Sequence, residues 1–114
     1  MIKRTYSKFT KPDGKDAWGV TINQEGGEVI SAFLFTDVSA FGEAIRKEFM
    51  KVLSGEQAEA ELTGNACHIR ITPQKTRIVN MLSMESEDES VVTVDSQELV
   101  ELIDEWLAIL HKQK

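Results

Sequence analysis

Cysteine and histidine are the residues best able to ligate a metal or attack a substrate, and this chain contains few of them. Cys67 and His68 are neighbours, and His111 is the second histidine. Neighbouring side chains of a strand point to opposite faces, so Cys67 and His68 cannot easily share one ion. Cys67 also alternates in phase with Ile69 and Ile71, which predicts a buried, inert thiol instead of an activated nucleophile. The sequence therefore predicts no catalytic site, no metal site and no cofactor.

Two clusters of carboxylates are the other groups that could take part in catalysis or binding. The first cluster, the loop acids, is Glu85, Glu87, Asp88 and Glu89, and the second, the helix acids, is Glu98, Glu101, Asp104 and Glu105. General acid–base catalysis needs carboxylates that are held in place, often with a pKa shifted by burial. A polar loop and the solvent-exposed face of a helix neither fix a carboxylate in place nor bury it, so we regard both clusters as candidate partner-binding residues.

The charge balance of the chain favours a basic partner. Lys and Arg total 13 against 19 Asp and Glu, which gives a formal net charge of −6. Sequence-independent nucleic-acid binding draws its affinity from cations that neutralise phosphates, so this balance argues against it. Two interpretations of the acids remain open: they form solvated faces of an ordinary protein, or they form an acidic docking surface that speeds association with a basic protein.

The length of 114 residues fits a single domain, 1–114. No apolar run approaches the roughly 18–20 residues of a membrane span, and the N-terminal segment MIKRTYSKFT lacks the apolar core of a signal peptide. The lone Cys67 allows no intramolecular disulfide, so a reducing, cytoplasmic setting is expected.

Three strands are predicted in the first part of the chain, at 2–10, 17–24 and 28–35. Pro12-Asp13-Gly14 and then Gln24-Glu25-Gly26-Gly27 supply the turns between them. The segment 28–35 is apolar on both faces, which is typical of a central strand covered on each side.

A helix is predicted over residues 38–54, where apolar residues change to steps of three and four. Asp37 is expected to cap its start, and Gly55 to end it in the left-handed conformation. The residues on its apolar face are Val38, Phe41, Ile45, Phe49 and Val52.

Alternation returns after this helix and predicts four more strands, at 58–63, 67–72, 76–82 and 91–94. Residues 83–90 carry four acids and no periodic apolar pattern, so they are expected to form an exposed loop. The order is βββα followed by ββββα, which indicates the α+β class, with antiparallel sheets and two helices packed against them.

The last helix has the strongest pattern. Asp95 can cap its start, and Glu98 stands at the spacing of a capping box. We expect Trp106, like Trp18 on the second strand, to anchor the core. The core stripe of the helix is Leu99, Ile103, Trp106 and Leu110, widened by Val100 and Leu107.

The C-terminal half resembles small bacterial immunity proteins of contact-dependent growth inhibition and other polymorphic toxin systems. The resemblance covers residues 66–114 and lies in a strand-rich body, an acidic turn, a short β-segment and the ending VVTVDSQELVELIDEWLAILHKQ, where Asp95 starts a helix and Trp106 lies near the terminus. It implies a cytoplasmic, non-enzymatic inhibitor that binds one cognate toxin, often a nuclease, and blocks its active site. A nuclease must be basic where it meets phosphates, so the acidic charge agrees with this role.

Two alternatives to an immunity protein follow from the residues themselves. A small acidic adaptor or regulatory domain would bind another basic protein through the same clusters. A small-ligand-binding or enzymatic domain would show a deep apolar pocket with converging polar groups.

Overall fold

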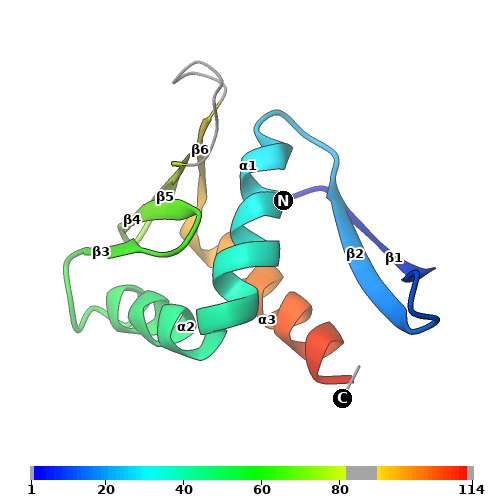
Figure 1. The fold of residues 1–114 in the computed structure, drawn as a ribbon. Coiled ribbons are helices and arrows are strands. Elements are labelled where there is room, and N and C mark those ends of the chain that lie inside the picture. The colour runs from blue at the N-terminus through cyan, green and yellow to red at the C-terminus, as the bar shows by residue number, and fades with distance from the viewer. Residues whose placement is uncertain (1, 82–89, 113–114) are drawn as a thin grey trace.

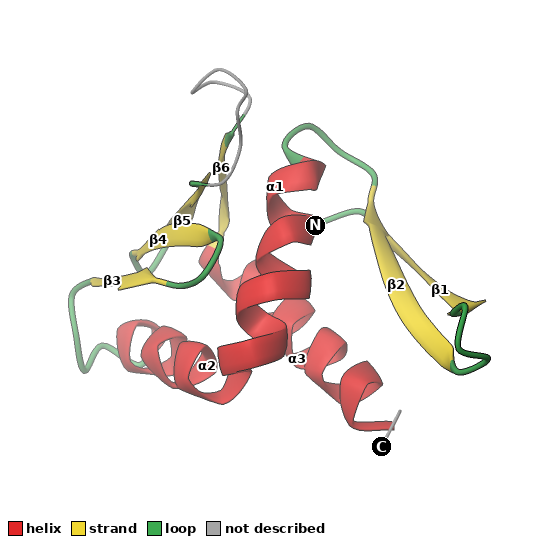
Figure 2. Cartoon of the chain, viewed as in Figure 1, coloured by secondary structure: helices red, strands yellow, loops and turns green. Residues whose placement is uncertain are grey.

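Helices form the centre of the fold, with a sheet on one side and a hairpin on the other (Figures 1 and 2). The computed structural model describes residues 2–81 and 90–112. The sheet is antiparallel in the order β3-β4-β5-β6. Its strands are β3 (Ala60–Thr63), β4 (Cys67–Ile71), β5 (Lys75–Asn80) and β6 (Val91–Asp95). The alternation that predicted these strands places one side of β4 against the helices and the other side towards solvent.

The N-terminal hairpin is a separate two-stranded antiparallel sheet of β1 (Arg4–Thr10) and β2 (Asp16–Ile22), with Arg4 opposite Ile22. Its turn contains Gly14 at φ 85°, a conformation that glycine adopts without steric cost. Val20 and Ile22 of β2 are buried, which confirms the alternation expected there. Trp18 is only half-buried and lies outside the main core, so its assignment as a core anchor was wrong.

The prediction of a third strand at 28–35 was also wrong. This segment forms α1 (Gly27–Ala32) and the start of a π-helix, η1 (Phe33–Val38). Its apolar residues are covered on two sides, because α1 contacts β2 on one side and β5 and β6 on the other, whereas Glu28 and Phe35 are exposed. A short apolar run of this kind fits a buried strand or a buried helix equally well. The predicted turn at Gly26-Gly27 therefore leads into a helix.

The two long helices confirm the α+β class. Helix α2 (Ser39–Leu53) ends near Gly55, which has the expected left-handed φ of 86°. Helix α3 (Ser96–Lys112) begins after Asp95, whose Oδ2 accepts the backbone N–H of Glu98 at 3.0 Å, as predicted. Trp106 is 1% exposed in the core, also as predicted. None of the described helices is long and apolar enough to cross a membrane.

Candidate functional site

A buried carboxylate joins the central helices to the sheet. Asp37 is 1% exposed, and its Oδ1 accepts the backbone N–H groups of Asn65 at 2.7 Å and Ala66 at 3.0 Å. Its Oδ2 accepts the N–H of Cys67 at 2.8 Å. Asp37 therefore closes the β3–β4 turn and does not cap its own helix, which corrects the predicted role. A Cβ on Gly64 would lie 2.5 Å from Cγ of Asp37, so only glycine fits beside this carboxylate.

The helical segment changes direction just after Asp37. The π-helix η1 holds Asp37, and Phe41 within α2 has non-helical angles of φ −128° and ψ 25°. Ser39 braces this junction, because its Oγ donates to the carbonyl of Leu34 at 2.9 Å and accepts from Nε1 of Trp106 at 3.1 Å. The Phe41 side chain is 47% exposed, although the helical pattern placed it on the core face.

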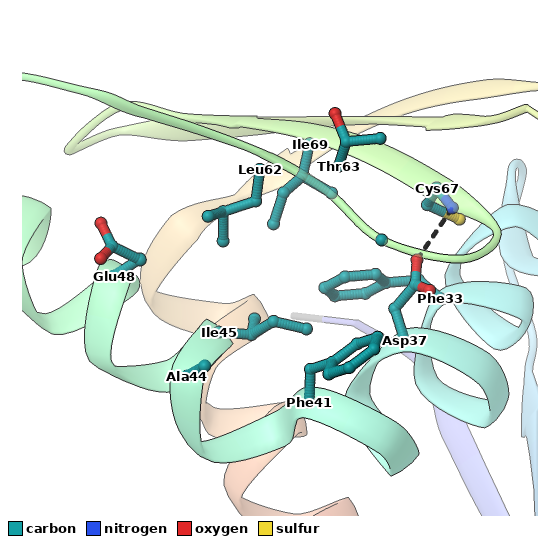
Figure 3. Close-up of a pocket in the computed structure, with 11 residues that line it drawn as sticks. Phe33, Asp37, Phe41, Ala44, Ile45, Glu48, Leu62, Thr63, Cys67 and Ile69 are labelled. Atoms are coloured by element: carbon teal, nitrogen blue, oxygen red, sulfur yellow. Dashed lines mark hydrogen bonds between the residues drawn. The ribbon is translucent and has the colours of Figure 1, made fainter.

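A cavity of about 240 Å³ lies between this bend and the β3–β4 hairpin (Figure 3). Its two carboxylates stand at opposite ends, Asp37 near Cys67 and Glu48 on α2 (Figure 3). Among the described residues, the polar contacts of the Glu48 side chain are long, at 3.4 Å to Nζ of Lys51 and 3.4 Å to Nε2 of Gln57. The apolar walls are Phe33, Phe41, Ala44, Ile45, Leu62 and Ile69.

The thiol at the cavity is buried and held protonated. Cys67 is 1% exposed, and burial, with the Asp37 carboxylate in addition, raises its pKa to about 12. His68 lies on the opposite face, where Nδ1 is 2.8 Å from Oγ1 of Thr63 and Nε2 is 3.7 Å from Glu61. The predicted burial of Cys67 and its divergence from His68 are therefore confirmed. Within the described residues, no group of histidine, cysteine and carboxylate side chains is placed to hold a metal ion.

Two of the four helix acids pair with arginines of other elements. Glu105 accepts hydrogen bonds from the guanidinium of Arg4, at 2.9 Å from Nε, and from the Tyr6 hydroxyl at 2.6 Å. The Arg4 hydrogen bond keeps the pKa of Glu105 below its ordinary value, and burial raises the pKa of Tyr6. Asp104 pairs with Nε of Arg46 on α2 at 2.6 Å. These contacts attach the hairpin and α2 to α3.

The other two helix acids differ in exposure. Glu101 is exposed and forms no ion pair with any residue that the structure describes. Glu98 is half-buried. The loop acids fall outside the described residues, and β6, whose five residues span roughly 16 Å, separates their segment from α3. The assignment of both clusters as partner-binding residues stays a prediction.

Comparison with known proteins identifies the family. A curated protein of Bacillus cereus named "Immunity protein" is 30% identical over 79 residues, which cover 69% of this chain and 67% of the relative. This chain belongs to the immunity protein family. No family model matches it, and no solved structure matches it. The resemblance to bacterial immunity proteins is thus confirmed at the level of the family.

The sequence of this immunity protein did not predict the hydrogen bonds of Asp37 to the β3–β4 turn, the Arg4–Glu105 contact or the cavity. A lone acid inside an apolar run, such as Asp37, was a usable signal, because a buried carboxylate must find hydrogen-bond donors. No local signal could have joined Arg4 to Glu105, which are 101 residues apart.

Proposed function

We propose that this immunity protein binds one cognate toxin and blocks its active site, without catalysing a reaction itself. The observation that carries the proposal is the 30% identity to a protein named for immunity over two thirds of both chains. The toxin would belong to a contact-dependent growth inhibition system or another polymorphic toxin system, and the encounter would take place in the cytoplasm.

The charge of the chain favours a basic, nuclease-like toxin. The immunity protein carries −6, whereas a nuclease needs cations where it holds phosphates. Opposite charges on the two binding surfaces accelerate association and orient the two proteins as they approach. An acidic inhibitor can therefore compete with nucleic acid for the same basic surface.

The ion pairs of α3 reduce the number of helix acids that are available to a partner. Asp104 and Glu105 are each paired with an arginine of the same chain, so they add little uncompensated charge. Glu101 is the exposed helix acid that remains free within the described residues, with Glu98 three residues before it. We propose that Glu101 and the loop acids meet the toxin, and Glu98 stays a candidate because it lies three residues before Glu101 on the same helix.

A growth assay tests neutralisation. The partner is captured from the native host in moderate salt and identified by mass spectrometry, and its toxic domain is then expressed in a susceptible bacterium. We expect growth arrest from the toxic domain alone and recovery when this immunity protein is co-expressed. Continued arrest with both proteins present and soluble would refute the proposed function. A gene beside this one that encodes a large protein with a variable C-terminal domain is the expected source of the toxin.

Association kinetics at two ionic strengths test the acidic surface. Glu101→Lys on α3 and Glu87→Lys/Asp88→Lys in the loop cluster should slow association and weaken its dependence on salt. Glu28→Lys is the matched control for Glu101→Lys, since it makes the same charge change at an exposed position of α1. If all variants associate at the same rate, the acidic docking surface is ruled out while neutralisation is not.

A further inference from the structure

We infer that the cavity between α2 and the β3–β4 hairpin receives an arginine side chain of the toxin (Figure 3). The inference rests on the proposed toxin binding and names the contact that would give it specificity. The cavity measures about 240 Å³, whereas small-molecule sites commonly span roughly 300–1,000 Å³. A space of this size suits one inserted side chain better than a metabolite.

The walls of the cavity suit a long side chain with a planar cationic end. Phe33 and Phe41 line it from the helices, and Ile45 and Leu62 contribute aliphatic surface. The methylene stem of arginine packs on apolar surface, and its guanidinium stacks on aromatic rings. Phe41 is 47% exposed beside the cavity, where an incoming protein would cover it. Exposed aromatic residues that become buried dominate the energy of many interfaces.

The charges of the cavity also favour a cation. Its ionisable lining residues, among those the structure describes, include the carboxylates of Asp37 and Glu48 and no lysine, arginine or histidine. Three backbone N–H groups stabilise the Asp37 carboxylate, but they do not neutralise its charge. Glu48 is within reach of Lys51, yet at 3.4 Å this contact is long for a charged hydrogen bond. A guanidinium, with its fork of donors, can offer Glu48 a better partner.

A titration of the immunity protein alone tests the chemistry of the cavity. N-acetyl-arginine methylamide is added while the methyl NMR signals of Ile45, Leu62 and Ile69 are followed, with the lysine and norleucine analogues as comparisons. We expect saturable shifts with the arginine analogue, weaker binding of the lysine analogue and none of norleucine. Equal binding of norleucine would overturn the cationic occupant, equal binding of lysine would overturn the preference for guanidinium, and no shifts with arginine would overturn the inference.

Two pairs of variants locate the interaction. Glu48→Gln removes the charge with little change of shape and should weaken binding of the arginine analogue roughly tenfold. Glu43→Gln changes an exposed position of the same helix outside the cavity lining and should leave the affinity unchanged. Ala44→Leu fills the cavity from an exposed helix position and should abolish the methyl shifts, while Ala108→Leu on α3 should leave them unchanged. Equal affinities within either pair would overturn the inference.

The toxin complex provides a second readout. Ala44→Leu and Glu48→Gln should speed dissociation of the captured toxin more than Ala108→Leu and Glu43→Gln do, because contacts that fill a cavity govern the dissociation rate. Unchanged dissociation would remove the cavity from the interface and leave neutralisation standing. Failure of the wild-type protein to restore growth would instead refute the proposed function, so the two failures are distinguishable.

Discussion

Removing the Asp37 carboxylate should strongly destabilise the protein. Asp37→Ala leaves three backbone N–H groups without their acceptor. The N–H groups of Ala66 and Cys67 are in buried hydrogen bonds, and that of Asn65 is part-exposed and can turn to water. A buried donor without a partner costs about 1–3 kcal/mol, so the two together predict a loss of about 2–6 kcal/mol. Such a loss is a large share of the roughly 5–15 kcal/mol that stabilises a domain.

Urea unfolding followed by tryptophan fluorescence measures this loss, and amide hydrogen exchange locates it. We expect the amides of Ala66 and Cys67 to exchange much faster in Asp37→Ala. Asp37→Asn should fall between the wild type and Asp37→Ala, because it keeps one oxygen acceptor but turns an NH₂ group towards a backbone N–H. Asp104→Ala is the matched control: it removes an exposed ion pair, which is worth at most about 1 kcal/mol.

A small effect of Asp37→Ala would refute the reasoning. If the free energy of unfolding falls by less than about 1 kcal/mol, the buried N–H groups have found other acceptors and the Asp37 carboxylate does not stabilise the turn. Gly64→Ala provides an independent check, because its Cβ would lie 2.5 Å from Cγ of Asp37 and push the carboxylate away. It should also destabilise the protein and expose the amide of Cys67 to exchange.

Three further predictions concern the core and the hairpin. Cys67 should react slowly with thiol reagents in the native protein because burial raises its pKa to about 12, and Cys67→Ala should cost about 1 kcal/mol in urea unfolding; rapid native labelling would contradict this. Trp106→Ala should cost about 3–5 kcal/mol, so an unchanged melting temperature would contradict its core position. Arg4 lowers the pKa of Glu105 from 4.5, so this contact stabilises the protein above that pH and is lost as the pH falls through the lowered value. The stability difference between wild type and Arg4→Met should therefore shrink in acid, and a difference that persists there would refute the assignment.

The identity of most elements is encoded in local patterns. Alternation around Cys67 and Ile69 predicted β4 and the direction of the thiol, because successive side chains of a strand face opposite ways. The three- and four-residue steps of α3 and the cap at Asp95 predicted the last helix and the burial of Trp106 in the same way. Each of these signals arises within a few residues and depends on backbone geometry alone.

Tertiary packing decided whether the segment 28–35 forms a strand or a helix. It is a short and mostly apolar run, so neither a period of two nor a period of 3.6 stands out. The segment becomes helical in a fold where α1 lies between β2 and the sheet and must be covered on both sides. Ile30, Phe33 and Leu34 are at most 1% exposed as a result.

Tertiary structure also decided what the acids do. Asp37 stabilises a turn about 30 residues away, Glu105 holds an arginine near the other end of the chain, and Glu48 reaches a cavity made with another element. Composition and periodicity alone show all three as polar residues. A carboxylate takes its role from the donors and apolar surfaces brought to it, and folding alone brings them there across such separations in the chain.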